Sequence, residues 1–528
     1  MAKPDWKRRL LVLAVVLVVL AVPLAWFGWY KFFREVDQPQ WITGDPTMNF
    51  LYGSIGSESE AGMPYWIVVV LPRIFGDQYL PGPGGYASLG LPWEQGREFP
   101  AGFSKKTVGF ERVAFNCALC HATTYRIDET TQPVIVAAGG SHTADIQGLL
   151  EFFSKSAADP RFNADTILTE IDLAYRLSWI DRMIYKFLAI PLTRKQLVSQ
   201  GEDFAWADSR PRWGPGRDAP MNLTKFNFLG LPQDDSVDNT DFPSIWHLNA
   251  RVQEGRTWPE EDYALEADFA KLDIDPSRLM LMNLAGDTTS FRSVVIDSAL
   301  GLRAQNTPFF HQRMRDLEEW LRELPPPDYP LEIDTELAAS GAQHFESHCA
   351  GCHATGRDNR MGTVIALEDI GTDPERTNAW TREAADGANA KVAEFDIQRT
   401  PMSKPERPGY IAMQLDGIWL RAPYLHNGSV PTVRALLEPA RCRPDTFHRG
   451  YDVLDAGDVG FVSRSCAIAS RPPPDGCELE TVQPKCVPAG KGWKYDTREK
   501  GNGNRGHEFG TALDPDEKNS LVEYLKTL

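Results

Sequence analysis

The chain has 528 residues, of which 42% are hydrophobic and 24% are charged, and its formal net charge at pH 7 is -17. This length allows two or three domains, each with a hydrophobic core of its own. The acidic balance argues against nucleic acid as a partner, because few cations remain to neutralise phosphate groups.

The first element in the chain is a long apolar segment. Residues 10–30 carry no charge, and their number matches the ~20 apolar residues that span a bilayer. Basic residues precede the segment, and Trp26, Trp29 and Tyr30 stand where an aromatic belt contacts the far interface. The pattern predicts that residues 1–34 form a cytoplasmic N-terminus and an uncleaved anchor. A cleavable signal peptide is the alternative, although the apolar run is long and the A-x-A pattern is poor.

Two cysteine pairs share the pattern C-x-x-C-H, at residues 117–121 and 349–353. This pattern is typical of c-type haem attachment. Cysteines at i and i+3 project to the same side of a helical turn, where both can form thioethers with the haem vinyl groups. A zinc site would need a second ligand pair nearby, and a thioredoxin-like dithiol would not need the histidine. The sequence therefore predicts two covalently attached haem c groups, held by Cys117, Cys120, His121, Cys349, Cys352 and His353.

Covalent haem attachment in bacteria takes place on the periplasmic side of the inner membrane. Together with the apolar segment, it predicts a single-pass inner-membrane protein with its haem domains in the periplasm. The remaining cysteines lie within residues 442–486, in a stretch rich in loops. In an oxidising compartment they are expected to form two disulfides, for which three pairings can be drawn. These residues are Cys442, Cys466, Cys477 and Cys486.

Between the two haem motifs the sequence predicts helices over residues 145–155, 165–189 and 309–324. The last helix carries apolar residues at helical spacing, namely Phe309, Met314, Leu317 and Leu321. It ends at the Pro-rich segment 324–330, which predicts a domain boundary. We therefore expect an N-terminal haem domain over residues 35–325 and a C-terminal cytochrome c domain over residues 326–528.

A helix capped by Asp334 is predicted to deliver Cys349. Gly341 and Phe345 share one face of that helix, where the C-terminal helix could approach closely. Asp514 caps this last helix, which carries a stripe of leucines at Leu521, Leu525 and Leu528. The predicted fold class is mainly α, with two cytochrome c-like haem domains and long loops behind one transmembrane helix.

Six stretches of residues 105–528 occur together and in order. They are FNCALCH, LPPPDYPLEIDTELAASG, CAGCHATG, LDGIWLRAPYLHNGSVPTVRALLEP, RGYDVLDAGDVGFVS and GNGNRGHEFGT. Together they resemble the dihaem c-type cytochromes of the bacterial cytochrome c peroxidase superfamily, and are most similar to the rubber-oxygenase-like branch. The resemblance implies one electron-relay haem and one reactive haem, close enough to exchange electrons. It also allows a calcium ion between the domains, although no D-x-D-x-D-G loop marks one.

Two residues are candidates for the sixth ligand of haem two. His507 lies in the segment that resembles the source of a distal histidine in the rubber-oxygenase-like branch. Met413 follows His353 by sixty residues, which is close to the spacing in simple cytochromes c. Two histidines would give a low reduction potential, whereas a His/Met pair would raise it. The loop around His426 resembles the haem-lining loop of the peroxidases, but the methionine that follows it there is missing.

The far side of haem one has a single nearby candidate. His142 follows His121 by 21 residues and could close this haem, or it could be an ordinary loop histidine. If no residue closes the haem, its iron keeps an open position for dioxygen or peroxide. The family's bridging tryptophan is missing from residues 282–288, which read MNLAGDT. Trp246 could replace it as a bridge between the haems, or could serve packing alone.

These observations predict a membrane-anchored dihaem cytochrome that acts as an oxidoreductase, peroxidase-like or oxygenase-like. Peroxide or dioxygen chemistry is expected at haem one, and electron relay through haem two. The alternative is a non-catalytic electron carrier with two six-coordinate haems. The expected partner is a periplasmic electron donor or acceptor, for which the negative charge favours a basic surface. The sequence marks no catalytic side chain, substrate or oligomeric state.

Overall fold

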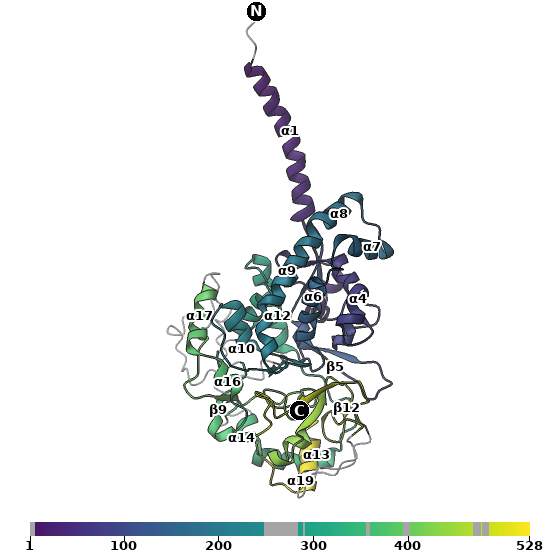
Figure 1. Ribbon diagram of the computed structural model, residues 1–528. Helices are drawn as coiled ribbons and strands as arrows, with labels where there is room; N and C mark the ends of the chain where they lie inside the picture. Colours follow the sequence, from purple (N-terminus) through teal and green to yellow (C-terminus); the bar gives the residue numbers. More distant parts are fainter. Residues whose placement is uncertain are drawn as a thin grey trace, which may run out of the picture.

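The computed structural model describes residues 6–247, 283–288, 291–354, 360–393, 402–467, 477 and 485–528. One long helix projects from a body in which the N-terminal part of the chain lies nearest to that helix (Figure 1). The helices α13 (Thr335–His348) and α19 (Pro515–Leu525) lie at the opposite end of the body, and the chain crosses between the two ends more than once.

The projecting helix is α1 (Trp6–Phe32). Within it, Leu10–Phe32 is long and apolar enough to cross a bilayer, and none of its most apolar stretch is buried. This finding is compatible with a membrane anchor or a signal sequence. The chain after α1 is fixed to the body, because β1 (Glu35–Val36) pairs antiparallel with β3 (Phe103–Val108). Gly109 packs so closely that an added Cβ would lie 2.4 Å from the carbonyl oxygen of Lys31.

An antiparallel four-stranded sheet with the order β1-β3-β4-β2 forms the centre of the N-terminal part. Its long hairpin pairs β3 with β4 from Phe103 opposite Phe115 to Val108 opposite Phe110. Helices cover this sheet and enclose an aromatic-rich core that includes Phe75, Phe152 and Phe153. The helices of this part are α2 (Gln40–Thr43), α3 (Pro46–Tyr52), α4 (Tyr65–Tyr79), α5 (Ala118–His121), α6 (Ile146–Ala158), α7 (Ala164–Ala174), α8 (Trp179–Ile184), the π-helix η3 (Tyr185–Ala189), α9 (Ile190–Asp203) and α10 (Pro220–Asn222). The other strands are β2 (Met63–Pro64), β4 (Phe110–Phe115), β5 (Ala122–Tyr125), β6 (Val134–Ala137), β7 (Arg217–Asp218) and β8 (Thr240–Asp241).

The C-terminal part has two long helices that cross, together with short helices and two-stranded ribbons. Its helices are α11 (Phe291–Gly301), α12 (Pro308–Glu323), α13 (Thr335–His348), α14 (Ala350–His353), α15 (Leu367–Ile370), α16 (Glu375–Ala379), α17 (Arg382–Ala393), α18 (Val433–Leu436) and α19 (Pro515–Leu525). Its strands are β9 (Val364–Ala366), β10 (Gly409–Ile411), β11 (Thr446–Arg449), β12 (Leu454–Asp455), β13 (Gly460–Phe461) and β14 (Trp493–Asp496). Helices dominate the regular structure, but the sheet shows that the prediction of a mainly α fold was too simple.

The crossing of α13 and α19 confirms the predicted helix pair. Asp334 caps α13, and its side chain accepts hydrogen bonds from the backbone of Glu336 and Leu337. Asp514 and Glu517 form a capping box at the start of α19. The helices touch at Gly341, where an added Cβ would lie 1.9 Å from the carbonyl oxygen of Ser520. Only glycine allows this approach.

Two helix predictions need correction. The helix predicted over residues 309–324 is α12, but Phe309 is 45% exposed whereas Phe310 is completely buried. Because Pro308 starts the helix, the buried face begins one residue later than the periodicity suggested. The helix predicted over residues 165–189 is interrupted at residues 175–178, and Ser178 caps the new helix α8 through Asp181.

The larger hydrophobic core combines residues from both sides of the expected boundary at 325/326. It includes Ala118 and Trp246 from one side and Phe345 and Leu521 from the other. A buried polar cluster also joins the two sides, since Arg449 pairs with Asp241 at 2.8 Å. The two expected haem domains remain a prediction, because their residues share one core.

The four remaining cysteines form two disulfides, between Cys442 and Cys477 and between Cys466 and Cys486. Spacing alone left three pairings open. The bonds enclose sequence separations of 35 and 20 residues and tie a long excursion to the body.

We expect the Gly341→Ala variant to be less stable than the natural chain by about 1–3 kcal/mol, because the new methyl group would push α13 away from α19. Thermal unfolding followed by circular dichroism measures the difference. Gly301→Ala is the matched control, since no atom lies within 4 Å of its added Cβ. Equal unfolding temperatures for the two variants would contradict close packing at Gly341.

Candidate functional site

The first C-x-x-C-H motif forms the short helix α5, where the two cores meet. The side chain of Asn116 accepts a hydrogen bond from Ala118 N and donates one to Gly53 O, both at 2.9 Å. Cys117 packs against the larger hydrophobic core, which includes Trp246. Cys120 packs against the aromatic-rich core of the N-terminal part, which includes Phe153. Burial raises the pKa of both thiols.

His121 is oriented by a backbone carbonyl 122 residues further along the chain. Its Nδ1 donates a hydrogen bond to Pro243 O at 2.9 Å. Burial lowers the pKa of the imidazole to about 4, so the ring is neutral. With Nδ1 protonated, Nε2 carries the lone pair that a metal ligand requires.

The second motif repeats this arrangement. Helix α13 leads into Cys349, and the turn α14 carries Cys352 and His353. Nδ1 of His353 donates to Met413 O at 2.6 Å, and burial lowers the pKa of the ring. Burial also raises the pKa of the Cys349 thiol to about 11. Both motifs therefore present a neutral histidine whose Nδ1 is tied to the backbone.

His507 lies across a cavity from His353. The centres of the two rings are 6.1 Å apart, and both residues line the cavity. Two imidazoles bound to one metal at about 2 Å each would place their ring centres roughly 6 Å apart. Burial lowers the pKa of His507 to about 3, which keeps this ring neutral as well.

The loop that carries His507 is held from several directions. His507 adopts a positive φ of 49°, and its amide donates to Ile370 O at 2.7 Å. The preceding Gly506 also has positive φ, and an added Cβ would lie 2.2 Å from the carbonyl carbon of Gly371. Arg443 donates to the carbonyl oxygens of Asn504, Gly506 and His507 at 2.6 to 3.2 Å.

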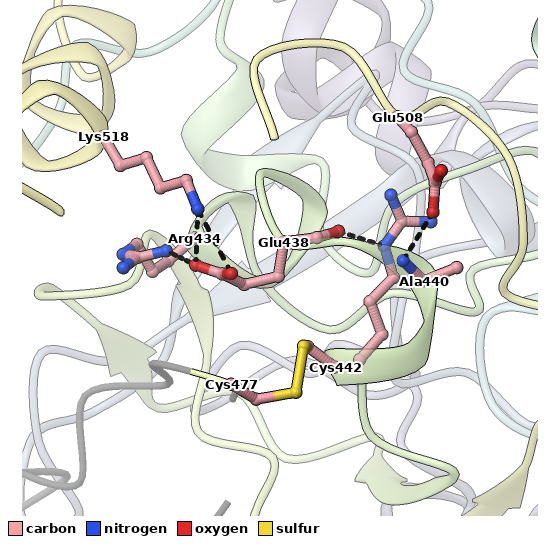
Figure 2. The surroundings of a disulfide bond; sticks show 8 residues. Arg434, Glu438, Ala440, Cys442, Cys477, Glu508 and Lys518 are labelled. Carbon is pink, nitrogen blue, oxygen red and sulfur yellow. Dashed lines mark hydrogen bonds and ion pairs between the residues drawn. A yellow bond between two sulfur atoms is a disulfide. The ribbon is translucent and has the colours of Figure 1, made fainter. Parts of the chain in front are cut away.

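Figure 2 shows the surroundings of the disulfide between Cys442 and Cys477, which adjoins Arg443 in the chain. Glu508, the neighbour of His507, accepts a hydrogen bond from Ala440 N at 2.7 Å. Glu438 is buried and pairs with Arg434 and with Lys518 of α19. The loop therefore has little freedom to move away from His353.

Met413 lies on the other side of His353. Its carbonyl oxygen accepts the hydrogen bond from Nδ1, the nitrogen that points away from a metal bound at Nε2. The backbone of Met413 is consequently behind the imidazole, whereas His507 faces it across the cavity. Met413 also lines this cavity, and the choice between His507 and Met413 as the sixth ligand of haem two remains a prediction.

The cavity between His353 and His507 has a volume of about 400 Å³, within the range of cofactor pockets. Apolar side chains such as Leu436, Leu521 and Leu525 form much of its wall. In the described part of the chain, several buried polar atoms of the wall have no hydrogen-bond partner. They are His142 Nε2, Thr372 Oγ1, Gln414 Oε1, Arg421 Nε and His507 Nδ1. A haem fits this chemistry, because its ring is apolar while its propionates are acceptors for buried donors such as Arg421.

His142 is buried, and its ring stacks on Phe461 with 3.7 Å between the ring centres. Its Nδ1 is hydrogen-bonded to Thr123 Oγ1 at 2.9 Å, and burial lowers its pKa to about 3. It lines the cavity that also contains His353 and His507. Its role as a ligand of haem one remains a prediction.

The surroundings of His121 differ from those of His353. The ring nearest to His121 is Phe242, at 6.4 Å between centres, and it adjoins Pro243, which accepts the hydrogen bond from Nδ1. Across the described residues, no histidine ring faces His121 as His507 faces His353. The two motifs are thus alike in the hydrogen bond that orients each histidine, and the facing pair of imidazoles is found at His353.

Trp246 lies between the two motifs and is completely packed. Its Nε1 donates a hydrogen bond to Asp416 O at 3.0 Å. A Cβ added at Gly139 or Gly417 would lie 3.0 or 2.8 Å from the indole ring, so only glycine fits at these positions. Within residues 283–288, Leu284 lines the cavity of His353 and His507, and Asp287 forms a buried ion pair with Arg376 at 3.1 Å. Met282 of that stretch lies outside the described residues.

Sequence reasoning missed Pro243, Gln414, Arg421 and Arg443. The first acts through a backbone carbonyl, which leaves no pattern in the sequence. The arginines could have been noticed in the loop that resembles the haem-lining loop of the peroxidases. No group of three or more His, Cys, Asp or Glu residues in the described ranges is arranged to hold a metal ion, so the calcium site has no structural support.

Comparison with known proteins matches a segment that contributes residues to the wall of this cavity. A family described as RoxA-like, cytochrome c-like matches residues 409–448, which contain Met413, Arg421, His426 and Arg443. Uncharacterized protein y4iM of Sinorhizobium fredii (strain NBRC 101917 / NGR234) is 30% identical over 331 residues, which cover 54% of this chain and 64% of that protein. Uncharacterized protein y4iJ of the same strain is 32% identical over 270 residues, 39% of this chain and 41% of that protein. The chain thus spans less than two thirds of these relatives.

These findings define a class of protein. Residues 409–448 are similar to a RoxA-like, cytochrome c-like domain, and a cytochrome c-like domain implies covalently bound haem and a haem-based redox function. A cytochrome c-like domain also indicates a location outside the cytoplasm. The apolar helix α1 is compatible with membrane attachment at that location.

Replacing His507 with glycine is expected to remove one axial ligand and to convert haem two completely from low spin to high spin. Optical spectra of the oxidised protein measure this change. Met413→Leu is the control, and its spectrum should stay low-spin, because the hydrogen bond from His353 goes to the backbone of Met413 and is kept. The opposite result, with Met413→Leu high-spin and His507→Gly unchanged, would reverse the assignment.

Proposed function

We propose that the chain is a membrane-anchored, periplasmic dihaem c-type cytochrome that acts as an oxidoreductase. In this proposal haem one, at residues 117–121, is the reactive centre for peroxide or dioxygen. Haem two, at residues 349–353, relays electrons. His121 and His353 bind the two irons, and His507 is the sixth ligand of haem two.

The observation that carries the proposal is the unequal environment of the two histidines. His353 has an imidazole partner at 6.1 Å, whereas no imidazole faces His121 in this way among the described residues. An iron with two protein ligands exchanges electrons without binding substrate, and an iron with one protein ligand keeps a position for an oxidant. At both motifs the histidine donates its Nδ1 hydrogen to a backbone carbonyl, which supports two attached haems.

A short connection between the motifs supports electron relay. His121 donates to Pro243 O, and Gln414 Nε2 donates to His247 O at 3.1 Å, at the other end of the same segment. Met413, next to Gln414, accepts from His353. Two hydrogen-bonded histidines are therefore linked through residues 243–247 and 413–414. Trp246 belongs to the segment 243–247, and its indole donates a hydrogen bond to the carbonyl oxygen of Asp416, two residues after Gln414.

An electron carrier without catalysis is the second candidate. His142 favours it, because its Nε2 is buried without a partner among the described residues and would be free to bind a metal. In that case both irons would have two protein ligands. In either case the partner is a periplasmic electron donor or acceptor, and the net charge of -17 suits a basic surface on it.

Low-temperature electron paramagnetic resonance of the oxidised protein distinguishes the two candidates. We expect two haems per chain by pyridine haemochrome assay, with high-spin and low-spin signals in equal amounts. After reduction, one haem per chain should bind carbon monoxide. Two low-spin haems that ignore carbon monoxide would establish the carrier instead, and a single haem per chain would refute the dihaem proposal.

Trp246→Phe is expected to slow electron transfer between the haems on the order of tenfold, which corresponds to about 1.4 kcal/mol of barrier. The shorter ring loses its hydrogen bond to Asp416 and part of its contact with Gly139. Flash photolysis of the carbon monoxide adduct follows the internal transfer. Trp419→Phe is the matched control, because Trp419 is equally buried and also donates to a carbonyl, that of Pro327. Equal rates in the two variants would leave Trp246 with packing alone.

A further inference from the structure

The helices next to α1 expose an unusual number of large apolar side chains. Trp179 is 77% exposed and Phe187 is 66% exposed, and five neighbours are also classed as exposed. We call these residues the apolar face. It consists of Leu173, Tyr175, Trp179, Met183, Phe187, Leu188 and Leu192.

The apolar face is not the side that builds the protein core. From α8 through the π-helix η3 to α9, Tyr185, Ala189, Ile190 and Leu197 are buried against the body. Trp179, Met183 and Phe187 recur every four residues on another side of the same segment. A surface helix normally turns charged residues to that side. Exposed apolar residues gathered in this way mark an interaction site.

The position of the apolar face relative to α1 is fixed by contacts. Lys31, one residue before the end of the candidate membrane span Leu10–Phe32, pairs with Asp181 of α8 at 2.6 Å. Asp181 lies between Trp179 and Met183. Figure 1 likewise shows α8 beside the end of α1 that enters the body. The apolar face therefore lies at the level where α1 would leave a bilayer.

We propose that the apolar face inserts into the interfacial layer of the bilayer that α1 spans. This inference rests on the proposed membrane anchoring. Tyr175 and Trp179 extend the aromatic belt that Trp26 and Trp29 begin on α1, and such residues favour the membrane interface. The flanking cations Arg176, Lys186, Arg194 and Lys195 are exposed and suit anionic lipid head groups. The body would then have two membrane contacts and a defined orientation.

The test is photocrosslinking of the full-length, haem-loaded chain reconstituted into phosphatidylcholine and phosphatidylglycerol vesicles. Benzoylphenylalanine replaces Phe187 in one variant and Leu17 of α1 in a second. In a third it replaces Leu337, which is 37% exposed on α13 at the opposite end of the body (Figure 1). We expect lipid adducts at position 187, detected by mass spectrometry, at a yield several-fold above that at position 337 and comparable to that at position 17.

The three positions separate failure of this inference from failure of the anchor. Adducts at position 17 but not at 187 would overturn the inference and leave the anchor intact. Adducts at neither position would overturn both. A covalent dimer formed from position 187, without lipid adducts, would show that a second copy of the chain covers the apolar face, and would also overturn the inference. Because Phe187 is largely exposed, the substitution should not disturb folding.

Discussion

Both candidate haem sites depend on one interaction, the hydrogen bond from histidine Nδ1 to a distant backbone carbonyl. His121 donates to Pro243 and His353 donates to Met413. Each bond selects the tautomer whose Nε2 is free, and burial keeps both rings neutral. A cysteine pair alone could attach a cofactor, but it could not point a lone pair at a metal. Because the acceptor carbonyls belong to neighbouring segments, the same bonds also tie the two sites to each other.

The difference between the sites comes from the loop around His507. Arg443 donates hydrogen bonds to the carbonyl oxygens of Asn504, Gly506 and His507 in that loop. Gly506 allows the chain to approach Gly371 closely. Such an arrangement costs backbone strain at His507, which a loosely held loop would release. The disulfide at Cys442 and the buried ion pair of Glu438 with Lys518 fix the segment that carries Arg443. Rigidity on this side suits a haem that exchanges electrons without changing its ligands.

Local signals in the sequence predicted the helices and their caps well. Asp334, Asp514 and Gly341 act as expected, because capping and close helix approach depend on residues a few positions apart. The four-stranded sheet escaped prediction, because β1 and β2 are only two residues long and become strands only by pairing with β3 and β4. The apolar face also escaped notice, since its residues read as part of one ordinary amphipathic helix.

The sequence by itself determined the chemistry of attachment. The relevant patterns are local: the two C-x-x-C-H motifs, the apolar segment and the remaining cysteines. Their interpretation follows from the covalent geometry of cysteine and from the transfer of apolar side chains out of water. Only the tertiary structure decided which carbonyl orients each histidine, which disulfides form among three pairings, and which residue faces His353. These outcomes depend on contacts between segments separated by tens to hundreds of residues. Chain spacing carries no record of such contacts, because packing of the shared core brings the segments together.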